Sequence, residues 1–202
     1  MGYCEYVKLA LEGKAEVYWN MGNACFAEYT LYSIGDWEHK MRVGSDVACV
    51  HWNVGLHDVI RTMDEDPITP PEIYGYYIDR IYTRLKKYYP EAEFIFATST
   101  PVQEELYDYW FARKNSDIDA INAVAVEIAE KHGVKINDLN ALLRNQPKEI
   151  FSDKTHFNTP AASELITKAV LKAVCPALGV NYDELTMPDF SKILIAGDDV
   201  LA

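Results

Sequence analysis

Residues 191–202 read Ser-Lys-Ile-Leu-Ile-Ala-Gly-Asp-Asp-Val-Leu-Ala. A run of Ile, Leu and Ala that is broken by Gly-Asp indicates a buried strand that delivers polar side chains to its carboxyl end. Open α/β sheets keep their binding and catalytic sites at that edge. A central parallel strand is normally followed by a crossover helix, and none follows here.

Residues 1–12 supply a helix of the kind that the strand lacks. Their apolar residues recur at helical spacing, Gly13 ends the pattern, and Lys14 to Trp19 indicates the next strand. Joined tail to head, the chain reads strand, Gly-Asp-Asp-Val-Leu-Ala, helix, strand. We therefore expect a circular permutation, and a break beside a site loop favours an engineered or designed origin over a natural one.

Three motifs resemble those of the SGNH or GDSL hydrolases, a superfamily of esterases and lipases. Ile-Ala-Gly-Asp-Asp-Val at 195–200 resembles the Gly-Asp-Ser motif that carries the family's nucleophilic serine. Residues 50–58, centred on Asn53, resemble the Asn motif, and Asp153-Lys154-Thr155-His156 resembles the Asp-x-x-His motif. Once the permutation is undone, the motifs follow the family's order. The nucleophile position, however, holds Asp199.

The resemblance implies a role for each of these residues. His156 would be the general base, Asp153 would orient it, and Asn53 would donate to the oxyanion. Gly22 would supply a backbone donor, although a turn glycine explains it equally well. The alternative interpretation of Asn53 is an Asx turn that needs no substrate, and the alternative interpretation of His156 is an ordinary solvated loop histidine. For His57 and Asp58 we expect structural hydrogen bonding.

Asp199 decides the expected chemistry. A carboxylate is a weak nucleophile and would give a mixed anhydride from an ester, so the protein is expected to be a weak or inactive esterase. A nearby carboxylate would also favour protonated His156, which cannot act as a base. The alternative is a protein on the same fold that is either inert or uses Asp199 as a general base for proton abstraction.

The predicted fold is a three-layer α/β/α sandwich that forms a single domain over residues 1–202. By the resemblance, its five-stranded parallel sheet is flavodoxin-like, with order 2-1-3-4-5 and the C-terminal strand as strand 1. Residues 179–190 would link the ancestral termini. Strands are predicted at 15–19, 46–52, 93–97, 134–139 and in the C-terminal run, and helices at 1–12, 24–40, 73–88, 118–128 and 160–173.

Composition excludes some partners and leaves others open. Thirty-one acidic and 19 basic residues give a net charge of −12, which argues against nucleic acid or an anionic membrane. A small-molecule ester or an acylated carbohydrate stays open as substrate. The aromatic run Tyr107–Phe111 either walls a pocket for it or packs on the core. The quaternary state is a monomer or a strand-swapped dimer.

Cofactors and a secretory route are not indicated by the sequence. The cysteines show no zinc or disulfide spacing, and three histidines show no metal pattern. We therefore expect no cofactor, no metal and reduced thiols. No signal segment or apolar run of membrane length is present, so a cytoplasmic protein is expected. The cysteines without zinc or disulfide spacing are Cys4, Cys25, Cys49 and Cys175, and the histidines without a metal pattern are His39, His51 and His132.

Overall fold

A parallel three-stranded sheet forms the centre of the molecule. The computed structural model describes residues 2–20, 22–44, 46–63 and 65–192, and Asp199 lies outside them. The strands are β1 (Cys49–Trp52), β2 (Glu93–Ala97) and β3 (Lys135–Asn137), in the order β1-β2-β3. All neighbours are parallel, with Trp52 opposite Phe96 and Phe96 opposite Ile136.

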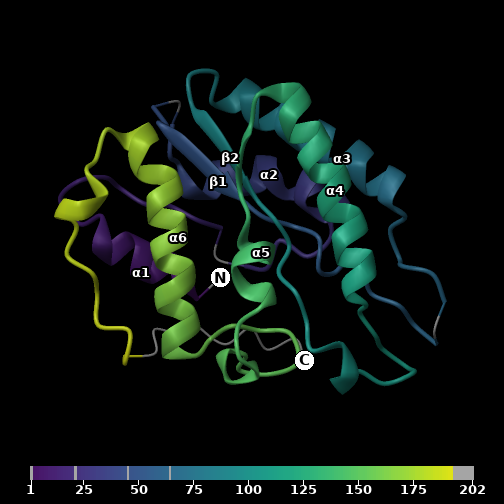
Figure 1. The fold of residues 1–202 in the computed structure, drawn as a ribbon. Coiled ribbons are helices and arrows are strands. Elements are labelled where there is room, and N and C mark those ends of the chain that lie inside the picture. Colours follow the sequence, from purple (N-terminus) through teal and green to yellow (C-terminus); the bar gives the residue numbers. More distant parts are fainter. Residues whose placement is uncertain (1, 21, 45, 64, 193–202) are drawn as a thin grey trace.

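Helices cover both faces of this sheet (Figure 1). One face carries α2 (Ala27–Met41), α3 (Pro71–Tyr88) and α4 (Asn115–His132). The other face carries α1 (Tyr3–Ala10) and α6 (Pro160–Leu178), and α6 lies across all three strands. The remaining elements are α5 (Leu139–Arg144) and the short 3-10 helices η1 (Glu104–Leu106), η2 (Lys148–Ile150) and η3 (Tyr182–Glu184).

Local sequence signals explain where the long helices begin and end. Both α3 and α6 have proline in the first turn, where its missing N–H has no intrahelical partner to lose. The Thr159 side chain caps α6 by accepting from the Ala162 N–H. Gly133 and Gly179 end α4 and α6 in the left-handed conformation that glycine adopts most easily.

The parallel sheet with helices on both faces confirms the coarse prediction. Residues 15–19, predicted as a strand, show no strand pairing within the described chain. Their exposure nevertheless alternates along the segment, as it does in a strand. A strand is defined by a hydrogen-bonded neighbour, and the neighbour expected from the sequence is the C-terminal run, which lies outside the described residues. The five-strand order therefore stays a prediction.

Two further boundaries differ from the sequence interpretation. The strand expected at 134–139 ends at Asn137, because Asp138 caps α5, a helix that the alternating pattern concealed. The predicted linker at 179–190 includes η3, and Leu185 and Met187 pack against the α1 and α6 side of the core. That segment is therefore anchored to the domain.

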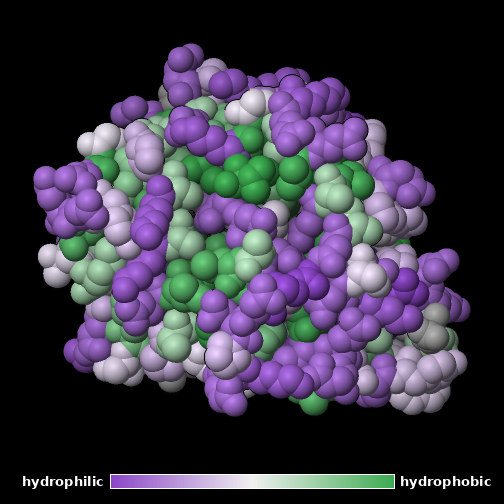
Figure 2. All heavy atoms as spheres, in the orientation of Figure 1, coloured by the Kyte–Doolittle hydropathy of each residue, from purple (hydrophilic) through white to green (hydrophobic). Residues whose placement is uncertain are grey.

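One face of the surface shows how the layers meet. Figure 2 shows that most of this face is hydrophilic at its periphery and that an apolar patch is exposed between α6 and α4. Ile136 on β3 and Leu142 on α5 are only partly buried. Among the described helices, none is both long and apolar enough to cross a membrane.

His51 on β1 should make stability depend on pH. Its ring contacts Tyr3 edge-on, and burial lowers its pKa to about 4. The unfolded chain, with an ordinary histidine pKa near 6.5, therefore binds the proton first as the pH falls. The stability that neutral His51 contributes is fully present above about pH 6.5, and it is lost progressively as the pH falls from about 6.5 to about 4.

The test compares urea unfolding at pH 7.5 and pH 4.5. We expect the parent protein to lose about 2–3 kcal/mol more than His51→Gln between these values. The control is His39→Gln, which changes an exposed residue of α2 and should keep the parent's pH dependence. Equal losses in the parent and His51→Gln would contradict the prediction.

Candidate active site

Asp153 and His156 form a hydrogen-bonded pair within one turn of chain. Asp153 Oδ2 lies 2.7 Å from His156 Nδ1, and Oδ1 accepts from the main-chain N–H groups of Thr155 and His156 at 2.6 and 2.8 Å. Both carboxylate oxygens are thus held by the turn itself. The predicted base and its orienting group are therefore adjacent.

The electrostatics of this pair favour an ionised carboxylate. Partial burial raises the Asp153 pKa, but the Thr155 N–H and His156 outweigh it and hold that pKa below its usual value. With Nδ1–H directed at the carboxylate, neutral His156 presents Nε2 as a proton acceptor. The histidine side chain is 64% exposed, so a substrate can reach that nitrogen.

Asn53 lies directly after β1, at the carboxyl edge of the sheet. Its side-chain Nδ2 donates to the carbonyl of Ala97, the last residue of β2, at 2.7 Å. That bond uses one of the two amide hydrogens, so the other is available to a ligand. The next carbonyl, of Val54, accepts from Tyr74 Oη at 2.8 Å and from Ser99 Oγ at 3.2 Å. The loop that carries Asn53 is therefore fixed from two sides.

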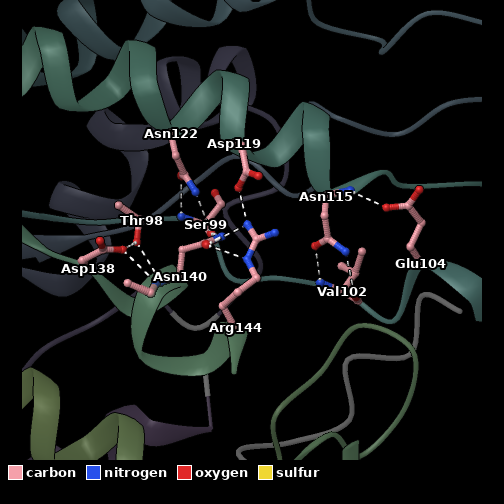
Figure 3. A network of polar contacts seen from close by, with 11 residues as sticks. Thr98, Ser99, Val102, Glu104, Asn115, Asp119, Asn122, Asp138, Asn140 and Arg144 are labelled. Carbon is pink, nitrogen blue, oxygen red and sulfur yellow. Dashed lines mark hydrogen bonds and ion pairs between the residues drawn. The ribbon is translucent and has the colours of Figure 1, made fainter. Parts of the chain in front are cut away.

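A network of side-chain amides fixes the loop after β2 (Figure 3). Asn122 makes two bonds with the main chain of Ser99, at 2.8 and 2.9 Å, and Asn140 adds a third at 2.7 Å. Further along, Asn115 bonds both the N–H and the carbonyl of Val102 at 3.0 Å. These contacts replace the strand pairing that the chain loses when it leaves the sheet.

The same loop holds the Asp153–His156 turn in place. The Gln103 N–H donates to the Lys154 carbonyl at 2.9 Å, and its side-chain amide donates to the Asp153 carbonyl at 3.0 Å. Tyr107 Oη lies 2.5 Å from Thr155 Oγ1. Of the aromatic run, Tyr107 thus supports the turn, whereas Tyr109 and Trp110 are exposed.

Arg113 connects the two loops that carry the candidate residues. Its Nε donates to the Leu56 carbonyl at 2.6 Å, and Nη1 lies 3.0 Å from Tyr107 Oη and 3.5 Å from Thr155 Oγ1. The residue is only 6% exposed. The sequence analysis did not predict this role for Arg113. The pattern that could have indicated it is a single arginine just after an aromatic run, because a cation buried there needs polar partners.

His57 extends the candidate site toward the segment before α2. Its Nε2 lies 3.1 Å from Asn23 Nδ2. Burial, then the charges of Arg113 and His156, lower the His57 pKa. Gly22 is exposed, and its carbonyl accepts from the Asn20 side chain. The structure therefore places the side chain of Asn23, the residue next to Gly22 in the predicted motif, against His57.

Asp58 has a structural role. It is fully buried, and both its carboxylate oxygens accept from the Ala27 N–H at the start of α2. Burial raises its pKa to about 6.

No cluster of three potential metal-ligating side chains is found in the described part of the chain, and its four cysteines form no disulfide.

Comparison with solved structures shows that the fold is shared with hydrolases. The lipase/acylhydrolase from Enterococcus faecalis has a TM-score of 0.67 and 14% identity, covering 92% of this chain and 87% of its own. LAE5, an α/β hydrolase from the metagenome of Lake Arreo, has a TM-score of 0.63 and 17% identity, and the match covers 88% of this chain and 81% of LAE5. Axe2, an acetylxylan esterase from Geobacillus stearothermophilus, has a TM-score of 0.60 and 15% identity, and the match covers 90% of this chain and 83% of Axe2.

Sequence comparison adds no family to this result. Neither a protein-family model nor a curated protein matches the chain. A G-D-S-L family lipolytic protein from Veillonella parvula also shares the fold, with a TM-score of 0.52 and 16% identity over 74% of this chain and 75% of its own. At such identities the likeness concerns the fold, an α/β hydrolase-like arrangement of helices around a parallel sheet.

Proposed function

We propose that this protein is an SGNH-hydrolase-like esterase whose nucleophilic serine is replaced by Asp199. The observation that carries the proposal is the Asp153–His156 pair, held 2.7 Å apart and linked through Arg113 to the loop that carries Asn53. The fold shared with a lipase/acylhydrolase and an acetylxylan esterase supports it. The substrate class is a small acyl ester or an acylated carbohydrate.

Each proposed role follows from the chemistry of acyl transfer. In the presence of a serine at position 199, His156 Nε2 would take the hydroxyl proton as Oγ attacks the ester carbonyl. The imidazolium would return that proton to the leaving alcohol, and the second amide hydrogen of Asn53 would stabilise the oxyanion. Water would then release the acid by the same route.

The chain as written should turn over esters weakly or not at all. Attack by the Asp199 carboxylate would produce an anhydride, and the carboxylate is a much weaker nucleophile than an activated serine. Gly22 remains a proposed backbone donor, with Asn23 beside it. The permuted five-strand order and the engineered origin stay predictions from the sequence.

The test is hydrolysis of a nitrophenyl acetate by the parent protein and by Asp199→Ser. We expect Asp199→Ser to raise kcat/KM by at least about 10³-fold, because covalent catalysis needs the hydroxyl nucleophile. Folding of both proteins is checked by circular dichroism. Asp199→Ala serves as the matched control and should stay as inactive as the parent.

A folded Asp199→Ser protein that does not hydrolyse the ester would refute the esterase proposal. The alternative then is an inert protein or one that uses Asp199 as a general base. Rates with a proton-transfer substrate, measured against pH for the parent and Asp199→Asn, distinguish those two. Only the general base predicts a rate that depends on ionisation of the carboxyl group and disappears in Asp199→Asn.

A further inference from the structure

His57 and His156 lie on two loops that Arg113 holds side by side. The Arg113 Nε donates to the carbonyl of Leu56, the residue before His57, at 2.6 Å. The Nη1 of the same guanidinium group lies 3.5 Å from Oγ1 of Thr155, the residue before His156. The proposed acyl transfer uses His156 as its base but assigns no task to His57.

The Asn23 side chain fixes which nitrogen of the His57 ring carries the proton. Asn23 Oδ1 accepts from the Cys25 N–H at 2.8 Å, an Asx turn that determines which way the amide group faces. Its Nδ2 therefore faces His57 and lies 3.1 Å from Nε2. Because an amide NH₂ group can only donate, His57 Nε2 accepts, and the proton of the neutral ring is on Nδ1.

The Nδ1–H group of His57 is available to a ligand. Within the described residues Nδ1 has no hydrogen-bond partner, and it is not among the side-chain atoms that this part of the chain buries without one. The ring is also packed against Phe26, edge to face, with the ring centroids 5.7 Å apart. His57 therefore presents an unpaired donor on a ring that is held from two sides.

The two histidines have partners of opposite kinds. His156 Nδ1 faces the Asp153 carboxylate at 2.7 Å, which stabilises a positively charged ring. His57 Nε2 faces an amide donor, so protonation of this ring would direct two N–H groups at each other. Burial, and then the charges of Arg113 and His156, also lower the His57 pKa. His156 is therefore suited to proton transfer, and His57 is suited to donating a hydrogen bond while it stays neutral.

His57 lies where the segments that carry the proposed oxyanion donors meet. It follows Asn53 on the same loop, and through Asn23 it contacts the segment that contains Gly22. Asp58, the next residue, accepts at 3.0 Å from the main chain at the start of α2, which ends that segment. Two consecutive residues thus connect the loop to the segment, and the first of them has the unpaired donor.

We propose that His57 is a further catalytic residue and that its Nδ1–H donates to the carbonyl oxygen of the substrate ester. This role rests on the proposed esterase function. In the Asp199→Ser protein, negative charge develops on that oxygen as the serine Oγ attacks the carbonyl carbon. The hydrogen bond from His57 strengthens at the same time, and its proton stays on Nδ1. His57 and Asn53 are then the two side-chain donors to the oxyanion.

Two substitutions in the Asp199→Ser background separate the donor from the contact with Asn23. The amide nitrogen of asparagine occupies the place of histidine Nδ1, so His57→Asn keeps the donor and does not reach Asn23. The longer amide of glutamine reaches the place of Nε2, so His57→Gln keeps the contact with Asn23 and loses the donor. We expect His57→Gln to lower kcat for nitrophenyl acetate by about 10²–10³-fold with KM nearly unchanged. His57→Asn should stay within about 10-fold of the background.

A purely structural His57 predicts the reverse order. His57→Asn would then lose stability in urea together with activity, and His57→Gln would resemble the background. Either that order or full activity in His57→Gln overturns the proposal. A folded Asp199→Ser protein without esterase activity refutes the proposed function and this role with it, whereas an active one with an unaffected His57→Gln variant refutes the role of His57 alone.

Nitrogen NMR of the parent protein supplies a readout that does not require activity. Correlations between the ring nitrogens and the ring carbon-bound protons show which nitrogen of each histidine is protonated. At pH 7.5 we expect neutral His57 with its proton on Nδ1. A proton on Nε2 of His57, or a positively charged ring at this pH, overturns the proposal, because the Nδ1–H donor or its neutrality would be missing.

Discussion

Removing the imidazole of His156 from the Asp199→Ser protein is expected to lower kcat for ester hydrolysis by about 10³-fold or more. The reason is geometric. Asp153 engages Nδ1, so Nε2 is the nitrogen left to accept the serine proton, and no other side chain of the Asp153–His156 turn can replace it. His156→Ala therefore removes both the base and the acid that returns the proton.

The measurement is a Michaelis–Menten comparison with the same nitrophenyl ester. His39→Ala in the same background is the control, because His39 is exposed on α2 and contacts none of the candidate residues in the described structure. A loss of less than about 10-fold in His156→Ala, with an unchanged fold, would show that His156 is not the base. Asp153→Asn should lie between His156→Ala and the unsubstituted background.

Gly55→Ala is expected to destabilise the protein by about 2–5 kcal/mol. Gly55 has a φ of 147°, which is costly for any residue with a Cβ. A Cβ there would lie 2.5 Å from Ser99 Oγ and 2.7 Å from Ile121 Cδ1. Both neighbours are almost fully buried, and Ser99 is held by its bond to the Val54 carbonyl, so neither can move freely.

Urea unfolding measures this loss, with Gly133→Ala as the control. Gly133 also has a positive φ, of 67°, but nothing lies within 4 Å of its added Cβ. That variant should lose only about 1 kcal/mol, the cost of the backbone conformation alone. Similar losses in the two variants would mean that close packing under the Asn53 loop does not contribute.

The sequence predicted best those features that depend on local patterns. Helical spacing and caps identified α1, α2, α3, α4 and α6, and apolar runs identified the three paired strands. The Asp153–His156 pair was predictable because its two members are three residues apart. The Arg113–Thr155 and Asn23–His57 contacts were not, because they join residues 42 and 34 positions apart along the chain. The α5 helix was missed because it is too short for a periodic signal.

The Asp153–His156 turn has a consequence for how the proton-transfer unit forms. All the hydrogen bonds that orient the imidazole, including both main-chain donors to Asp153, come from four consecutive residues. The pairing therefore has almost no loop-closure entropy to overcome. It can assemble early in folding and can persist while more distant parts of the sheet open and close. The contacts from Gln103 and Tyr107 then decide where in the molecule this preformed unit points.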